Sequence, residues 1–392
     1  MELSQYFDPI GLPNFQERFT QHPQSLGSLS EVYTLTFPDY DAAEIVLFGV
    51  EDERGATGRE GASEAPDLIR SYLYQLAAPL STVKIADLGN LVIPEDRNQL
   101  FKDIAEITAH LLRLGKIVVM LGGTQDIVYG QYLGFQPLEM DVNYITVDSS
   151  PDILDPEAGV HHHSYNNIIL THSPNYLRSF ANLAAQTYFV TEGERKALKS
   201  LNFETLRIGD IHADLTLAEP YLRDAHIVGF DLAAVRHSEA PGTNHPSPAG
   251  LSVEEACQLA RFAGMGYNTQ AVSFCEVNPQ TDVRNMTSHL TALMIWYFIE
   301  GVYNRMDDRP SADRSNVIKY VARLEGPVKE IQFFKSRTTG RWWMEVPSPE
   351  TLNRRGSQFE LVPCAYRDYQ LAQENEIPER WWVAHYRFTE TL

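Results

Sequence analysis

The sequence has few cysteines and none of the short motifs typical of common catalytic or nucleotide-binding sites. Its three cysteines, Cys257, Cys275 and Cys364, are widely spaced and form no C-x-x-C pair, which argues against a disulfide framework and a thiolate metal site. The chain has no P-loop, no G-x-G-x-x-G after a predicted strand, no G-x-S-x-G and no H-E-x-x-H. The usual signatures of NTPases, dinucleotide-binding enzymes, serine hydrolases and zinc proteases are therefore missing.

Basic residues and long apolar runs are also scarce. The 392-residue chain carries 32 Lys and Arg against 52 Asp and Glu, a formal net charge of −20. Such a chain repels phosphate backbones and anionic lipids, so we expect no nucleic acid partner and no membrane insertion. No apolar run approaches the roughly 20 residues that span a bilayer, and the first residues lack the pattern of a signal peptide. We therefore expect a cytoplasmic protein.

Between about residues 44 and 300, short apolar runs alternate with amphipathic helical stretches. The runs are rich in Val, Ile, Leu and Phe without polar alternation, which predicts strands covered on both faces. A helix is predicted over residues 100–114, and another begins at the capping box of Ser252 and Glu255. We expect an α/β fold with a three-layer, doubly wound, mainly parallel sheet, whose carboxyl strand ends carry the ligand site. The expected strands are residues 45–50, 84–88, 117–121, 144–148, 187–190, 226–232 and 271–277.

The character of the sequence changes after about residue 305. Residues 307–314 read DDRPSADR, a polar stretch rich in turn formers, and a candidate β-hairpin follows with Gly340 in its turn. Four of the five tryptophans lie in this part, at positions 342, 343, 381 and 382. We expect one α/β domain over residues 1–304 and a C-terminal lobe over residues 305–392, either packed on the main domain or used as an interface.

Five segments at the predicted strand ends resemble the arginase family, or ureohydrolases, in order and spacing. They are GVEDERGATGREGASEAPDLIR (49–70), LGGTQD (121–126), VDSSPD (147–152), GFDLAAVRHSEAPG (229–242) and FCEVNPQTD (274–282). The chain resembles the formimidoylglutamase branch most, and residues 305–392 match no known part of the family. The resemblance implies an arginase-like fold and two manganese ions that activate water for attack on a guanidinium or amidine carbon.

The resemblance also implies six metal ligands, two histidines and four aspartates, of which this chain keeps three. The kept and lost positions are Asp148, Asp152 and Asp231, which remain aspartate, and Gln125, Ser150 and Ala233, which replace two histidines and one aspartate. In addition, Arg236 and His237 stand where the family has an Asp-Pro pair.

Three states of this site remain open. In the one we favour, no cofactor binds, and Arg236 neutralises a cluster of Asp148, Asp152 and Asp231 that would otherwise repel one another. In the second, the same aspartates and Gln125 bind one hard ion weakly, such as Mn²⁺ or Mg²⁺. In the third, a complete two-metal centre persists.

Glu276 and a histidine run are the other candidate functional residues. The resemblance implies that Glu276 binds a substrate guanidinium through its carboxylate, although a local salt bridge is the alternative. His162 and His163 are candidates for a catalytic histidine of the family. The whole run 161–163, with His172 and His245, offers an alternative metal source. We expect the run to be a solvated loop instead.

Two functions follow from these observations. The first, which we favour, is a non-catalytic binding or scaffolding subunit that keeps the fold, releases no urea or formamide, and contacts a protein partner through its Trp-rich lobe. The alternative is a metal-dependent hydrolase of a guanidino, formimino or related C–N substrate. The family resemblance also implies a homo-oligomer.

Overall fold

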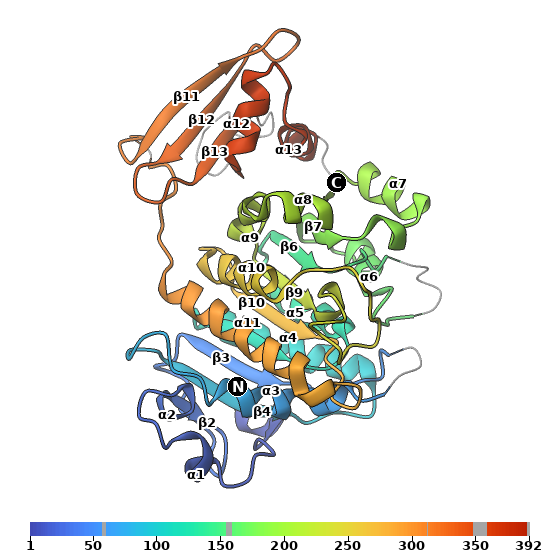
Figure 1. Cartoon of the computed structure of the whole chain (residues 1–392), viewed down its shortest axis with the longest axis vertical. Helices are drawn as coiled ribbons and strands as arrows, with labels where there is room; N and C mark the ends of the chain where they lie inside the picture. Colours follow the sequence, from blue (N-terminus) through green and yellow to red (C-terminus); the bar gives the residue numbers. More distant parts are fainter. Residues whose placement is uncertain (57–59, 154–158, 312, 348–358, 390–392) are drawn as a thin grey trace.

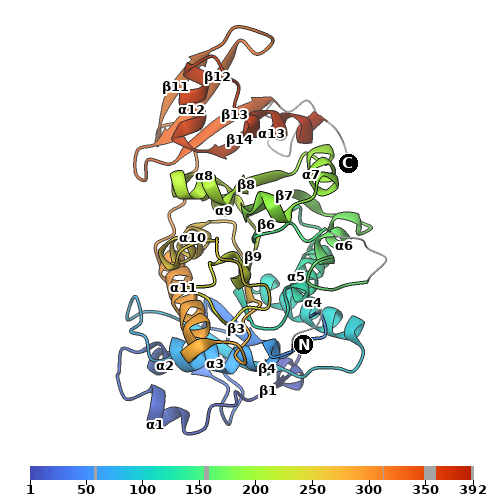
Figure 2. The same ribbon diagram turned by 45° about the vertical axis from the view of Figure 1, so that its right-hand side comes forward.

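A computed structural model of the chain describes residues 1–56, 60–153, 159–311, 313–347 and 359–389. Parts of the resembling segment 49–70 and of the expected C-terminal lobe therefore lie outside the described residues. The described residues form a ten-stranded sheet and a separate four-stranded sheet. Figures 1 and 2 show the larger sheet between layers of helices, with the smaller sheet at one end of the molecule.

The large sheet is parallel except at one edge. Its strand order is β1-β4-β3-β5-β10-β9-β6-β7-β8, with β2 also paired to β4, and only β1 runs antiparallel to its neighbour. Nearly all residues of its central strands are buried, which explains their continuous apolar sequences. The strands are β1 Phe7–Asp8, β2 Ser30–Val32, β3 Ile45–Gly49, β4 Ile85–Leu91, β5 Ile117–Leu121, β6 Val142–Val147, β7 Leu177–Ala185, β8 Glu204–Arg207, β9 Ile227–Asp231 and β10 Ala271–Cys275.

Helices cover both faces of this sheet. One hydrophobic core packs α3 (Ala65–Leu73), α10 (Val253–Met265) and α11 (Met286–Tyr303) on one face, together with the shorter α8 and α9. A second core packs α4 (Arg97–Arg113) and α5 (Val128–Phe135) on the other, with α6 and α7. The prediction of a three-layer, mainly parallel α/β fold is confirmed. The remaining helices of this part are α1 Phe15–Phe19, α2 Leu26–Leu29, α6 Tyr165–Thr171, α7 Glu192–Ser200, α8 Ile208–Ala213 and α9 Glu219–Asp224.

The local signals for two of these helices are also confirmed. The apolar stripe of α4 faces the second core, and its N-cap Asp96 accepts a hydrogen bond from the Asn98 N–H. Ser252 and Glu255 form the reciprocal capping box that begins α10. Among the described residues, no helix combines the length and hydropathy needed to cross a membrane.

One predicted strand was wrong. Residues 187–190 do not extend the sheet, because Thr187–Phe189 form a 3₁₀ turn in which Tyr188 and Phe189 are exposed. The strands of this region are β7 and β8 instead, which the sequence did not reveal. Ser179, Asn182 and Ala184 lie within buried β7, where small and polar residues have low strand propensity. Pairing with β6 and β8 overrides that preference.

The C-terminal lobe has its own sheet and core. Four antiparallel strands, β11 (Val317–Arg323), β12 (Glu330–Ser336), β13 (Trp342–Pro347) and β14 (Phe359–Cys364), pack against α12 (Tyr366–Gln373) and α13 (Glu379–Thr389). Strands β12 and β13 pair across the turn with Gly340, as the hairpin pattern predicts.

The four tryptophans of this lobe serve its core and its contact with the large sheet's helices. Trp342 and Trp381 lie in the lobe core, and Trp382 packs against it. Trp343 is buried beneath the guanidinium of Arg223 on α9, whose centre lies 4.4 Å from the ring. The lobe therefore packs on the main domain at α9, beside which it lies in Figure 2.

Candidate metal centre

Three aspartates meet at the carboxyl ends of two neighbouring strands. Asp231 is the last residue of β9, Asp148 directly follows β6, and these two strands are paired in parallel. Asp152 joins them from the loop after β6, where its backbone adopts a left-handed conformation with φ of 48°. One carboxylate oxygen from each residue lies within 4.8 Å of the other two. The structure thus brings together the three acids that the sequence predicts as metal ligands.

The three carboxyl groups are short of positive charge. Burial, more than any other cause, raises the pKa of Asp148 and Asp231 well above the usual range and the pKa of Asp152 to about 8. Within the described chain, no arginine or lysine forms an ion pair with any of the three. His163 Nδ1 lies 3.3 Å from Asp152 Oδ1. A buried acidic cluster of this kind suits a divalent cation.

The side-chain amide of Gln125 completes this cluster. One of the two polar atoms of the amide lies 3.1 Å from Asp148 Oδ2 and 3.1 Å from Asp231 Oδ2. The other polar atom lies 3.1 Å from Thr146 Oγ1 and 3.2 Å from Tyr165 OH. Without a cation, hydrogen bonding favours Nε2 facing the two carboxylates. A cation among the carboxylates favours the reverse, because it attracts Oε1 while Nε2 donates to Thr146. Gln125 therefore fits both states of the site.

Glu276 lies beside the aspartates with an unused oxygen. It directly follows β10, is 1% exposed, and adopts a left-handed φ of 65°, a strain that functional sites often hold. Its Oε1 accepts a 2.8 Å hydrogen bond from the Gln125 backbone N–H and lies 3.7 Å from His162 Nδ1. Among the described residues, its Oε2 meets no hydrogen-bond donor. The charge of Glu276 contributes to the raised pKa of Asp148 and Asp231, so it faces the same site.

The histidine run is not a solvated loop, which corrects the sequence-based expectation. His162 is 3% exposed, and the centre of its ring lies 4.0 Å from that of His163, with the two rings tilted by 31°. His245, from the loop after β9, brings its ring within 4.8 Å of both. One nitrogen from each of the three rings lies within 4.8 Å of the others. Burial lowers the pKa of His163, which favours its neutral form.

Arg236 does not supply the missing cation, which is a second correction. Its Nε lies 3.5 Å from Glu239 Oε1 and 3.4 Å from the Leu251 carbonyl oxygen. The backbone at this point pairs with a later segment: the Arg236 N–H donates to the Leu251 carbonyl, and Val235 forms an isolated β-bridge with Leu251. The Arg236 side chain thus forms a local ion pair with Glu239, and among the described residues no arginine pairs with the three aspartates.

A family model described as the arginase family matches residues 43–300, about two thirds of the chain. The chain belongs to the arginase family. It is 29% identical over 271 residues to a formimidoylglutamase of Geobacillus thermodenitrificans, covering 66% of this chain and 83% of that protein. A formimidoylglutamase of Rhodococcus jostii is 23% identical over 288 residues, covering 66% and 87%.

Solved structures agree on the fold. A Trypanosoma cruzi formiminoglutamase with Mn²⁺ superposes with a TM-score of 0.65 at 21% identity, covering 72% of this chain and 99% of that one. The Bacillus subtilis formimidoylglutamase gives a TM-score of 0.63 at 19% identity, covering 71% and 92%. At this identity the likeness shows the fold alone.

Two of the three positions where this arginase-family chain departs from the expected ligands, Ser150 and Ala233, do not offer replacement ligands in place. Ser150 Oγ donates a 2.5 Å hydrogen bond to Asp152 Oδ1. At position 233 the residue contributes only its backbone, since the Ala233 N–H donates to Asp231 Oδ1 at 2.6 Å. Both positions therefore support the retained aspartates. The carboxylate site fits one divalent ion better than two.

An adjoining ion-pair network was missed from the sequence. Asp126 is fully buried, forms an ion pair with Arg97, and has a pKa raised to about 6, chiefly by burial. Arg97 also lies 3.6 Å from Asp52, which pairs with Arg54. Asp52 and Asp126 both lie in segments that resemble the family, and that was the available signal. Arg97 begins α4, far from those segments in sequence.

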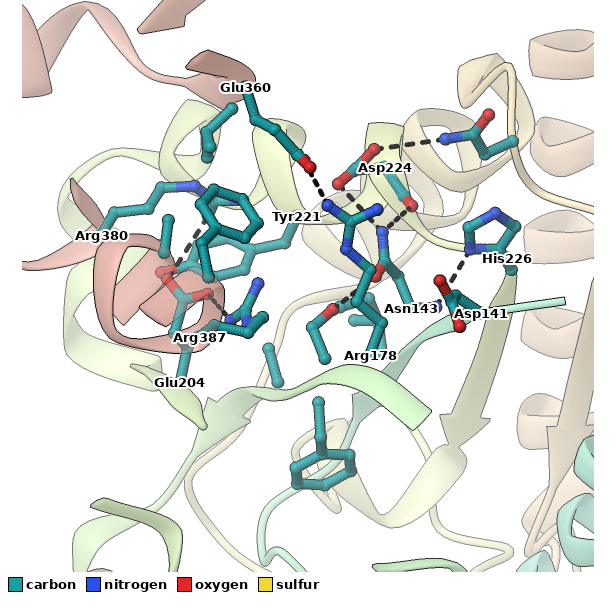
Figure 3. Close-up of a pocket in the computed structure, with 18 of the residues that line it drawn as sticks. Asp141, Asn143, Arg178, Glu204, Tyr221, Asp224, His226, Glu360, Arg380 and Arg387 are labelled. Carbon is teal, nitrogen blue, oxygen red and sulfur yellow. Dashed lines mark hydrogen bonds and ion pairs between the residues drawn. The ribbon is translucent and has the colours of Figure 1, made fainter. Parts of the chain in front are cut away.

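A polar cavity of about 250 Å³ lies at the opposite ends of the strands, away from the acid cluster. Figure 3 shows Arg178, Glu204 and Glu360 among its lining residues, beside His226 at the amino end of β9. Its charges are largely paired: Glu204 lies 3.8 Å from Arg380 and 3.4 Å from Arg387, and Arg178 pairs with Glu360. These pairs join the C-terminal lobe to the main domain, so we interpret the cavity as part of that interface.

Proposed function

We propose that this protein is a metal-dependent hydrolase that cleaves a C–N bond of a linear amidine, with N-formimidoylglutamate as its substrate class. The observation that carries this is the set of Asp148, Asp152 and Asp231 at the carboxyl strand ends, with Glu276 beside it. Asp148 and Asp152 are buried, Asp231 is half-buried, and no arginine or lysine of the described residues pairs with any of the three. Arginase-family membership and the formimidoylglutamase relatives support the same reading.

Asp148, Asp152 and Asp231, with Gln125 Oε1, would hold one divalent ion. Oxygen ligands of this kind suit Mn²⁺ or Mg²⁺. When bound, such an ion supplies Lewis-acid chemistry and makes water a better nucleophile at neutral pH. The fit is favourable because the three carboxyl groups lie together and, among the described residues, no arginine or lysine neutralises them.

The chain's own residues account for binding and proton transfer. Glu276 Oε2, buried without a donor among the described residues, accepts a hydrogen bond from an amidinium N–H and fixes the substrate carbon above the aspartates. Water adds to that carbon, the C–N bond breaks, and the departing nitrogen takes up a proton. His163 is suited to carry that proton, because it is part exposed and Asp152 orients its ring.

Glu276→Gln should lower kcat/KM for N-formimidoylglutamate about 100-fold with Mn²⁺ present. The substitution keeps the shape of the side chain but removes the charge that binds the amidinium, a loss of about 3 kcal/mol. The assay measures formamide release, with agmatine and arginine tested in parallel for urea. Glu239→Gln, outside the site, is the control and should retain activity. An unchanged kcat/KM in Glu276→Gln would exclude its substrate-binding role.

A non-catalytic binding protein is the second candidate. It is favoured by Ser150 and Ala233, which hydrogen-bond to the retained aspartates where the family resemblance implies further ligands. Absence of turnover on all three substrates, in protein with bound Mn²⁺, would favour this candidate.

A further inference from the structure

Three histidines from two separate loops converge beside the carboxylate site. His162 and His163 come from the loop between β6 and α6, and His245 comes from the loop between β9 and α10. One nitrogen of each ring lies within 4.8 Å of the other two. His162 is buried, His163 is part exposed and His245 is exposed, so the cluster opens to solvent on one side. Three protein nitrogens with an open side are the arrangement of many catalytic metal sites.

Carboxylates lie next to two of these rings. Asp152 Oδ1 lies 3.3 Å from His163 Nδ1, and Glu276 Oε1 lies 3.7 Å from His162 Nδ1. A carboxylate beside a ligating imidazole fixes its tautomer and orientation and increases its basicity, a feature of most histidine metal sites. Two buried carboxylates, those of Asp152 and Glu276, thus lie beside two of the three rings.

The two loops are themselves held by buried hydrogen bonds. Asn244, next to His245, accepts a 2.7 Å bond from Asn278 Nδ2, and the Asn278 N–H donates to the Gly242 carbonyl at 2.7 Å. On the other loop, the His162 N–H donates to the Gly55 carbonyl. The rings therefore meet because the backbone places them there, which is the preorganisation that a ligand site requires.

We propose that His162, His163 and His245 bind a divalent transition-metal ion, of the class of Zn²⁺ or Co²⁺, at a site distinct from the carboxylate triad. Imidazole nitrogen prefers these ions, whereas carboxylate oxygen prefers Mg²⁺ and Mn²⁺. The two sites adjoin at the contact of His163 with Asp152. This site goes beyond the proposed hydrolase and does not require it. An ion bound here would occupy a ring nitrogen of His163, so the proton transfer assigned to His163 belongs to the protein without that ion.

Cobalt titration of the metal-free, untagged full-length protein tests the site. With excess Mg²⁺ present to occupy the carboxylates, Co²⁺ should bind with one equivalent, give a visible ligand-field spectrum, and show imidazole ligands by X-ray absorption. His163→Ala and His245→Ala should each weaken Co²⁺ binding at least about tenfold, since each removes a ligand. His245→Ala alters an exposed residue, so it keeps the test valid should His163→Ala fail to fold.

Two variants separate this site from its alternatives. His237→Ala removes an exposed histidine outside the cluster and should leave the cobalt spectrum unchanged. Asp231→Asn should also leave it unchanged, because Asp231 belongs to the triad. A spectrum that survives both His163→Ala and His245→Ala, or that only Asp231→Asn removes, overturns the proposal. If the wild-type protein shows the cobalt spectrum but does not hydrolyse N-formimidoylglutamate, the proposed function is contradicted and the histidine site is still supported.

Discussion

Asp231→Asn is expected to remove Mn²⁺ binding at the carboxylate site and to lower kcat/KM at least about 1,000-fold. Asp231 ends β9 and offers one of three carboxylates that meet within 4.8 Å. The asparagine keeps the shape but removes the ligand charge, and a 1,000-fold loss corresponds to about 4 kcal/mol of transition-state stabilisation. Formamide release measures the rate, and calorimetric titration measures Mn²⁺ binding.

The same variant separates lost function from lost folding. In the metal-free protein, burial and then the neighbouring carboxylates raise the pKa of Asp231, because a negative charge is unfavourable there. An asparagine has no charge at this position and so avoids that cost. Metal-free Asp231→Asn should therefore melt at or above the temperature of metal-free wild type. Asp210→Asn, an exposed carboxylate on α8, is the matched control and should bind Mn²⁺ normally. Normal Mn²⁺ affinity in Asp231→Asn would show that the triad is not the ion site.

Removing divalent ions is expected to destabilise the wild-type protein, and adding Mn²⁺ should restore it. An ion that binds only the folded state stabilises it by about 2.7 kcal/mol at one hundred times its dissociation constant. For a chain of this size that stabilisation corresponds to a shift of roughly 3 °C in Tm. Thermal melts with chelator and with excess Mn²⁺ measure it. Equal melting temperatures in the two conditions would contradict a bound ion.

The difference in Tm between protein with Mn²⁺ and protein with chelator should grow as the pH rises. Burial raises the pKa of Asp152 from its ordinary value to about 8, so the folded metal-free protein holds a proton that the unfolded chain has already released. Stability from this group is fully present below about pH 4, the ordinary pKa of an aspartate, and it is lost as pH rises toward 8. The Tm in chelator should therefore fall across this window. With Mn²⁺ the fall should be smaller, because the ion replaces the proton.

The strands and the three layers were predictable where local and global preferences agree. Val118, Val119 and Met120 of β5, for example, are apolar, strand-forming and buried on both faces. Strand β7 was not predicted because its buried residues include Asn182 and Ala184, whose preferences do not favour a strand. The pairing of β7 with β6 on one side and β8 on the other overrides those preferences. The aromatic pair Tyr188 and Phe189 led to the opposite error, because these exposed residues were predicted to form a strand.

The acid cluster was predictable because Asp148, Asp231 and Glu276 directly follow or end parallel strands, whose carboxyl ends share one edge of the sheet. The histidine cluster was not, because it depends on two loops meeting in space, 82 residues apart between His163 and His245. Arg236 was misplaced for a similar reason. Its side chain donates a hydrogen bond to the carbonyl of Leu251, which lies 15 residues further along the chain, and forms an ion pair with Glu239.

Anomalous diffraction from crystals grown with Mn²⁺ tests the carboxylate site most directly. We expect a manganese peak within coordination distance of Asp148, Asp152 and Asp231, with the Gln125 amide oxygen facing the ion. Asp231→Asn crystals grown in the same way should lack that peak. An empty site between the three aspartates in the wild-type crystals, with well-ordered density and Mn²⁺ in excess, would contradict a metal-dependent role for this cluster.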